Sequence, residues 1–176
     1  MQRTDDIQIL PETESHYPGI EKLVRESFAT VEHSDGDEHL LIYRLRNTPE
    51  YIDALSLVAV SDGIPVGYIM FTRIHIGTVE GLALAPLAVA PDFQKQGIGS
   101  LLVNRGHELA SQMKFRFSVV LGSPTYYTRF GYRPASYYNI HPPFAVDDKY
   151  FMVCSLTDKE SLIPKGVVRY SEAFGL

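Results

Sequence analysis

The chain has 176 residues, of which 45% are hydrophobic and 21% charged, a globular composition that argues against disorder. Its one cysteine, Cys154, excludes an intramolecular disulfide framework and a multi-cysteine metal cluster. No apolar run reaches membrane-spanning length, and the polar start does not look like a signal peptide. We therefore expect one cytoplasmic domain over residues 1–176, with no membrane partner.

The formal net charge of −5 is distributed unevenly along the chain. Residues 1–80 carry 14 acidic and 6 basic residues, whereas residues 81–176 carry 7 acidic and 10 basic residues. The acidic half suits a cationic partner, and the mildly basic half suits a small polyanion. Nucleic-acid binding needs a clustered basic stripe, so the sequence predicts no nucleic-acid partner.

The first part of the chain predicts a strand and two helices. Residues 7–10 favour a short strand closed by Pro11, and residues 17–28 and 38–46 favour helices. Apolar residues at helical spacing predict the buried face of the first helix: Ile20, Leu23, Val24 and Phe28. The predicted apolar side of the second helix consists of Leu40, Leu41, Tyr43 and Leu45.

The middle of the chain is rich in predicted strands. Residues 55–60 and 64–76 flank Ser61-Asp62-Gly63, which indicates a hairpin with an Asp-Gly turn. Residues 78–89 are almost free of charge after Glu80, so we expect a strand that is buried on both faces of a sheet.

A helix over residues 97–113 is the clearest in the chain. Its predicted apolar stripe consists of Ile98, Leu101, Leu102, Gly106, Leu109 and Met113. A strand at 115–122, a short helix at 124–130 and a strand-like piece at 150–156 follow. This order predicts an α/β or α+β domain with a mixed sheet.

Residues 84–100 read as a strand, a loop and a glycine-containing helix start. Amides at a helix N-terminus lack intrahelical partners and lie at the positive end of the helix dipole. Gly97 and Gly99 remove two Cβ atoms there, so a phosphate could approach the amides. The P-loop and GxGxxG patterns are both absent, and a lone Gly-x-Gly can also serve close helix packing.

Two motifs give the chain a family resemblance. Gln94-x-x-Gly97-x-Gly99 follows Leu87-Ala88-Val89 and resembles the pyrophosphate-binding signature of the GNAT superfamily of N-acetyltransferases. Tyr127-Thr128-Arg129-Phe130-Gly131-Tyr132 is similar to the family's Tyr-x-x-x-Gly-aromatic element. The resemblance covers roughly residues 55–132. It implies a mixed, mostly antiparallel central sheet that is flanked by helices and splayed at an acetyl-CoA site.

The resemblance implies acetyl-CoA as cosubstrate and no metal. The loop before the long helix would hold the pyrophosphate, and the preceding strand edge would pair with the pantetheine arm. These implied binding residues are Leu87, Ala88, Val89, Gln94, Lys95, Gln96, Gly97, Ile98, Gly99 and Ser100. Pro86 cannot donate to a sheet ladder, which is consistent with the strand irregularity that precedes the splay in the family.

The implied reaction is direct attack of a primary amine on the thioester in a ternary complex. By resemblance, the Val89 N–H would stabilise the oxyanion, and Tyr127 occupies the family's position for protonating the leaving thiolate. Tyr126 is an alternative donor, because a short helix could present either ring. Glu80, His75 and a water chain remain three options for the general base.

The acceptor is predicted only as a small-molecule or peptide amine. The acidic half contains the helices that form acceptor sites in the family, which favours a cationic acceptor. Residues 33–39 form a polar loop there that lacks a full EF-hand pattern, so we predict no metal site. Residues 135–176 could complete the sheet, cover the acceptor site or form a homodimer contact. A non-catalytic acyl-CoA sensor is the alternative function, and another nucleotide-binding protein is a third.

Overall fold

The computed structural model describes residues 6–32 and 34–176. Seven strands form the main sheet: β1 (Gln8–Pro11), β2 (Ser56–Ser61), β3 (Ile64–Ile76), β4 (Val79–Val89), β5 (Phe117–Leu121), β6 (Arg133–Pro134) and β8 (Phe151–Ser155). The α-helices are α1 (Tyr17–Phe28), α2 (Glu38–Arg46), α3 (Ile98–Gln112) and the short α4 (Pro124–Tyr127). Two further strands, β7 (Ile140–His141) and β9 (Gly166–Val167), pair with each other.

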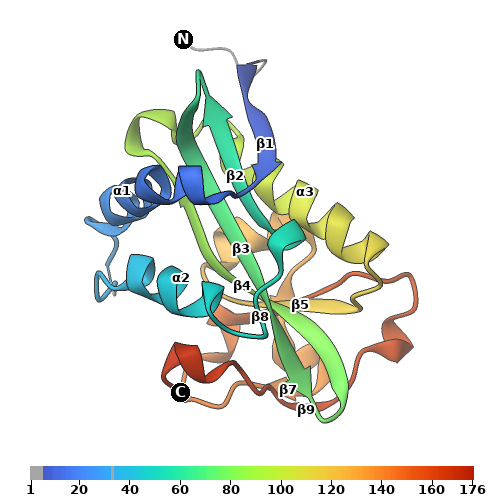
Figure 1. Ribbon diagram of the computed structural model, residues 1–176. Coiled ribbons are helices and arrows are strands. Elements are labelled where there is room, and N and C mark those ends of the chain that lie inside the picture. The colour runs from blue at the N-terminus through green and yellow to red at the C-terminus, as the bar shows by residue number, and fades with distance from the viewer. Residues whose placement is uncertain (1–5, 33) are drawn as a thin grey trace.

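The main sheet has the order β1-β2-β3-β4-β5-β8-β6, and only β4 and β5 run parallel. Helices α1 and α2 lie over one face of the sheet, and α3 lies over the other (Figure 1). This mixed, mostly antiparallel architecture confirms the predicted fold class. The predicted bounds of α1 and α2 are confirmed to the residue.

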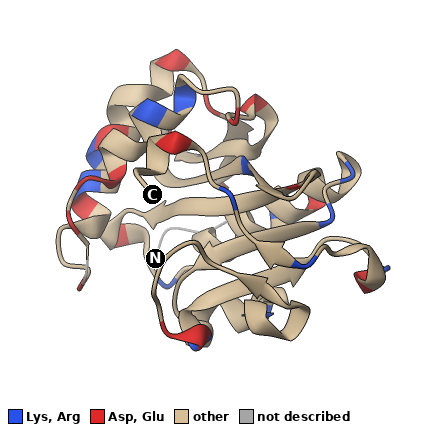
Figure 2. Ribbon diagram, turned by 90° about the horizontal axis from the view of Figure 1, so that it is seen from below, with Lys and Arg blue, Asp and Glu red and all other residues tan. Residues whose placement is uncertain are grey.

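The core is divided between the two faces of the sheet and its far end. Phe71 and Leu102 belong to the cluster beneath α3, whereas Val24, Leu45 and Tyr68 belong to the cluster beneath α1 and α2. A third cluster surrounds β5 and β8. The strands are nearly free of charge, and most charged residues lie on helices and loops (Figure 2). None of the helices in the described ranges is long and apolar enough to cross a membrane.

The predicted apolar side of α2 is wrong in two positions. Leu40 and Tyr43 are 43% and 67% exposed, and Ile42, which the prediction leaves out, is buried; Leu45 is buried as predicted. Nine residues give little more than two turns, so the periodic pattern alone could not orient this helix. Its orientation is fixed by packing on α1 and the sheet.

The predicted stripe of α3 also needs correction. Leu101 and Met113 are each 42% exposed, whereas Val103 and Ala110 are buried. The side of α3 that packs on the sheet is centred between Leu102 and Gly106. Leu101 therefore lies at the edge of the buried side of the helix.

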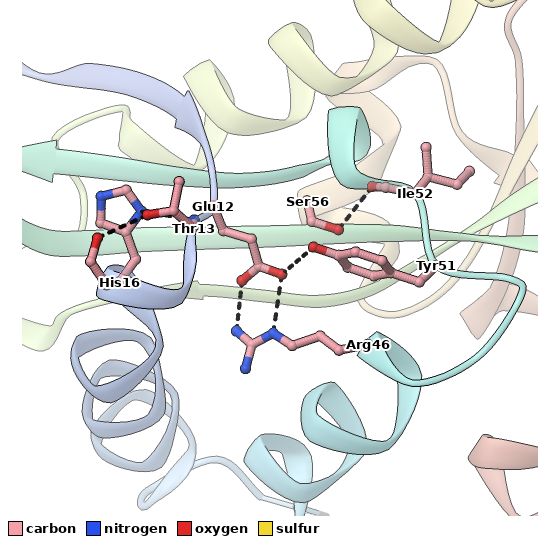
Figure 3. Close-up of polar contacts among 8 residues, drawn as sticks. Glu12, Thr13, His16, Arg46, Tyr51, Ile52 and Ser56 are labelled. Atoms are coloured by element: carbon pink, nitrogen blue, oxygen red, sulfur yellow. Dashed lines mark hydrogen bonds and ion pairs between the residues drawn. The ribbon is translucent and has the colours of Figure 1, made fainter.

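A buried ion pair fixes α2 against the start of the sheet (Figure 3). The Glu12 side chain is fully buried, and Arg46 donates to it twice, from Nε to Oε1 (3.1 Å) and from a terminal nitrogen to Oε2 (2.6 Å). The Tyr51 hydroxyl donates to the same carboxylate at 2.7 Å, and the Arg46 guanidinium lies 3.6 Å from the centre of the Tyr17 ring. The cluster joins the end of β1, both first helices and the segment before β2.

The sheet splits open between β4 and β5. These parallel strands pair only at Leu82–Ser118 and Ala83–Val119, and the β3–β4 register shifts near Pro86. Beyond Ala83 the two strands diverge. The irregularity expected from Pro86 and the splay implied by the family resemblance are therefore both present.

The C-terminal segment completes the sheet, one of the three roles considered for it. Strand β8 pairs antiparallel with β5, and β6 pairs with β8. The last turn of the chain, Glu172–Phe174, lies against α2, where Arg44 Nε donates to the Ala173 carbonyl at 3.1 Å.

Candidate functional site

A hollow of about 590 Å³ lies where α3 begins. We call it the basic pocket, because its only charged lining residues in the described ranges are Lys95 and Arg129. Its lining consists of Leu87, Val89, Phe93, Gln94, Lys95, Gly97, Ile98, Gly99, Ser100, Ser123, Tyr126, Tyr127 and Arg129. The predicted loop and the segment around α4 therefore meet in space.

The start of α3 is shaped by backbone conformations that suit an anion site. Gly97 is the N-cap residue at φ +86°, and Lys95 also has a positive φ of +61°. The Leu101 N–H makes the first helical hydrogen bond, to the Gly97 carbonyl at 3.0 Å. The amides just before it have no intrahelical acceptor, so they are available to a ligand. Gln94 Nε2 donates to the Val89 carbonyl at 3.1 Å and ties this loop to β4.

Gly99 is needed because Tyr126 lies against it. A Cβ atom at this position would stand 2.4 Å from the Tyr126 hydroxyl oxygen. Burial raises the pKa of Tyr126, although Arg129 and the Ser100 hydroxyl act in the opposite direction. The Tyr126 hydroxyl, although it comes from α4, thus lies beside the first residues of α3.

Two predicted binding residues do not line the basic pocket. Ala88 is only 3% exposed and packs in the cluster beneath α1 and α2. The Gln96 side chain points back along its loop and donates to the Asp92 carbonyl at 3.0 Å.

Sequence reasoning missed Phe93, Ser123 and Arg129 as lining residues. Arg129 lies with its guanidinium carbon 4.7 Å from the centre of the Tyr126 ring, and its Nε donates to the Tyr126 carbonyl at 2.9 Å. A cation inside the second motif was the available signal for this residue.

The edge of β4 exposes backbone groups to the gap. The Ala90 N–H donates to the Val66 carbonyl at 2.9 Å, which makes these two residues a hydrogen-bonded pair. Pairs alternate along an antiparallel ladder, so the peptide groups of Val89 and Leu87 point away from β3. Ser27 Oγ donates to the Val89 carbonyl at 3.0 Å, which leaves the Val89 N–H facing the gap.

A second hollow, of about 460 Å³, opens beside the gap. We call it the acidic pocket, because Glu32 and Glu38 are its only charged side chains in the described ranges. The lining consists of Phe28, Val31, Glu32, Ser34, Glu38, Leu41, Ala83, Leu84, Ala85, Pro86, Leu87, Val119, Val120, Leu121, Gly122, Tyr127, Phe144, Tyr170, Phe174 and Leu176. The loop expected at this site thus contributes Ser34 and Glu38, whereas His33 lies outside the described residues.

Leu87 and Tyr127 line both pockets. Burial raises the pKa of Tyr127, so its hydroxyl keeps its proton at neutral pH. Its ring packs edge-on against Tyr126 and Tyr132, at centroid distances of 5.0 and 5.6 Å. Tyr126 lines only the basic pocket.

The two side chains considered as general bases lie elsewhere. His75 and Glu80 face each other across β3 and β4, with His75 Nε2 3.6 Å from Glu80 Oε1, and neither lines either pocket. The described residues contain no group of three His, Cys, Asp or Glu side chains arranged to hold a metal ion.

A buried polar chain lies behind Tyr127. His107 Nε2 and Ser118 Oγ are 3.0 and 2.9 Å from the Tyr132 hydroxyl oxygen. Burial lowers the pKa of His107 to about 4. Nearby, burial raises the pKa of Cys154 to about 12, and its Sγ donates to the Phe130 carbonyl at 3.3 Å. Cys154 is thus a packed thiol, as its apolar strand indicates.

Comparison with known proteins places this site in a family. The family model described as an acetyltransferase (GNAT) domain matches residues 53–134, a range that contains both sequence motifs. The Escherichia coli K12 protein described as uncharacterized N-acetyltransferase YhbS is 31% identical over 160 residues, covering 89% of this chain and 92% of YhbS. The chain belongs to the GNAT acetyltransferase family.

Solved structures of the family share the fold. The E. coli YhbS structure in complex with CoA has a TM-score of 0.88 at 28% identity, covering 97% of this chain and 93% of that one. A GNAT acetyltransferase from Brucella melitensis in complex with acetyl-CoA has a TM-score of 0.79 at 29% identity, covering 96% and 97%. The predicted family is therefore confirmed.

Proposed function

We propose that this protein transfers the acetyl group of acetyl-CoA to a primary amine by direct attack in a ternary complex. The observation that carries the proposal is the junction of two oppositely charged pockets at Leu87 and Tyr127. The basic pocket suits a polyphosphate, and the acidic pocket suits an amine. Their junction lies at the gap between β4 and β5.

The basic pocket fits coenzyme A in three respects. The free amides at the start of α3 suit the pyrophosphate, and Lys95 and Arg129 add positive charge. The backbone N–H and carbonyl of Leu87, which point away from β3, suit an amide of the pantetheine arm, which would pair with β4 as an added strand. The missing side chain at Gly99 leaves room beside the Tyr126 hydroxyl. Relatives with CoA and acetyl-CoA bound support this assignment.

The residues at the junction supply the groups that acyl transfer needs. The Val89 N–H donates to the carbonyl oxygen as negative charge develops on it. As the C–N bond forms and the C–S bond breaks, the Tyr127 hydroxyl gives its proton to the sulfur. The bound ammonium first gives one proton to water to become the attacking amine, and the nitrogen gives a second proton to water once the C–N bond has formed. Tyr127 then regains its own proton from solvent. Tyr127 is favoured over Tyr126 because it alone of the two lines both pockets.

Replacing Tyr127 by phenylalanine tests the proposal. We expect Tyr127→Phe to lower kcat for coenzyme A release by about 100-fold or more, the usual contribution of a proton donor. The affinity for coenzyme A, measured by isothermal titration calorimetry, should be unchanged. Tyr137→Phe is the matched control, because Tyr137 is exposed and lines neither pocket.

A non-catalytic sensor predicts a different outcome. It would bind acetyl-CoA without turning over any member of an amine panel, and Tyr127→Phe would change nothing measurable. Protection from heat by ATP or NAD but not by coenzyme A would instead indicate another nucleotide-binding function.

A further inference from the structure

The walls of the acidic pocket are mainly apolar. Phe28 and Leu41 come from the layer of α1 and α2, and Pro86 and Leu121 come from the two diverging strands. No Lys, Arg or His side chain is found among the described lining residues. A ligand in this pocket therefore meets aliphatic and aromatic surface and negative charge only.

The C-terminal segment adds an aromatic wall. The Tyr170 ring lies 6.2 Å from the Phe144 ring and 5.0 Å from the Phe174 ring, measured between centroids, and all three rings line the pocket. Burial raises the pKa of Tyr170, so this wall carries no charge at neutral pH. Aromatic faces attract ammonium groups and also pack against apolar ligands.

The negative charge of the pocket is held in place at Glu38. This residue lies in the first turn of α2, where the helix dipole stabilises a carboxylate. Ser34 Oγ donates to Glu38 Oε1 and in turn accepts the Gly36 N–H at 3.0 Å. Glu32 lies just beyond α1 and is more exposed.

We infer that the acceptor for this site is a primary amine carried on an aromatic or branched aliphatic body that bears no anionic group. The inference rests on the proposed function and names its substrate class. The apolar walls hold the body, and the two carboxylates raise the local concentration of the cationic amine. A free amino acid would bring its carboxylate beside Glu32 and Glu38 without a compensating cation. A polyamine has no aromatic or branched apolar body, so it would leave most of the apolar walls without a partner.

Three acceptors separate these possibilities by direct binding. 2-Phenylethylamine and L-phenylalanine differ only in the carboxylate, and spermidine has amines without an apolar body. On protein saturated with coenzyme A, calorimetry should show 2-phenylethylamine binding at least about tenfold more tightly than either of the others. Equal or tighter binding of L-phenylalanine or spermidine would overturn the inference.

Variants of Glu38 test the role of charge. Glu38→Gln should weaken 2-phenylethylamine binding about tenfold, because the attraction between the carboxylate charge and the ammonium group is lost. Its amide oxygen can still accept from Ser34, so the loop is preserved. Glu38→Arg should reverse the order of 2-phenylethylamine and L-phenylalanine. Glu26→Gln, on the exposed side of α1, is the control and should change neither affinity. An unchanged order in Glu38→Arg counts against the inference.

Turnover with acetyl-CoA separates this inference from the proposed function. If the amines bind in the expected order but none is acetylated, the class of ligand inferred for the acidic pocket stands and the acetyltransferase proposal fails. If L-phenylalanine or spermidine is acetylated in preference to 2-phenylethylamine, the acetyltransferase proposal stands and the acceptor class fails.

Discussion

His107 is buried against Phe71 and Tyr132, where its charged form is disfavoured. Its pKa is about 4 in the folded protein and 6.5 by default in the unfolded chain. The unfolded chain therefore binds more protons between these values, so stability falls as pH decreases from about 6.5 to 4. The expected contribution lost across this window is about 3 kcal/mol.

Chemical denaturation at several pH values measures this effect. The His107→Gln variant, which can still hydrogen-bond to Tyr132, should lose less stability between pH 6.5 and 4 than the parent protein does. His141→Gln is the control, because His141 is exposed. Identical pH profiles for the parent and His107→Gln would contradict the assignment.

Gly99 and Tyr126 should be coupled in ligand binding. Gly99→Ala forces the Tyr126 hydroxyl to move, because the new Cβ would lie 2.4 Å from it. We expect the Kd for coenzyme A to rise about tenfold while thermal stability changes little. In a Tyr126→Phe background the same alanine should cost clearly less, and a double-mutant cycle by calorimetry measures the difference. Additive effects would show that the two groups act separately.

Among individual residues, the sequence predicts those whose role depends on the local backbone. It does not predict those that reach the site only through tertiary packing. Gly97 could be identified because its position before a helix and its spacing from Gln94 are local features. Arg129 has only a weak signal, its positive charge inside the second motif, because it reaches the basic pocket only when the segment around α4 packs beside α3. Ala88 was predicted from the strand motif, but alternation along the strand turns its side chain toward α1 and α2.

The second helix depends on a buried charge for its position. Removing Arg46 leaves the carboxylate of Glu12 without its ion-pair partner, so Arg46→Leu should lower the free energy of unfolding by about 3 kcal/mol or more. The double variant Glu12→Leu/Arg46→Leu should be more stable than Arg46→Leu alone, because no unpaired charge remains. Urea denaturation measures both changes.

An exposed ion pair gives the control for this prediction. Arg25 lies 2.9 Å from Glu21 on the solvent side of α1. Arg25→Leu should change the free energy of unfolding by less than about 1 kcal/mol. A loss of similar size for Arg25→Leu and Arg46→Leu would contradict the role of burial.

The sequence predicts the ends of the helices better than it predicts which side of each helix is buried. Pro49 and the polar run before Glu38 delimit α2 locally, so its ends could be read from the chain. The exposure of Tyr43 and Leu101 depends on which partner each helix meets, which periodicity does not specify. The ion pair of Glu12 and Arg46 joins residues 34 positions apart and had no sequence signal.

Across the whole molecule, the sheet is two half-sheets joined at two residue pairs. Strands β1 to β4 form one half, and β5, β8 and β6 form the other. The family resemblance predicts a splay. It does not predict that β4 and β5 pair at only two positions, which is seen in the register of the folded sheet. Few hydrogen bonds cross this seam, so local opening there should cost less free energy than opening within either half.

A ligand in the gap would therefore contact both halves and make opening of the seam less favourable. Hydrogen exchange followed by mass spectrometry, with and without coenzyme A, should show added protection on both sides of the seam: at Leu87 and Val89 of β4, and at residues 119–121 of β5. Val58, inside the first half, should be unaffected. Uniform protection of all strands would contradict this view. If the ligand holds the seam closed, binding of the donor raises the free energy needed to open it, and release of the product lowers that free energy again.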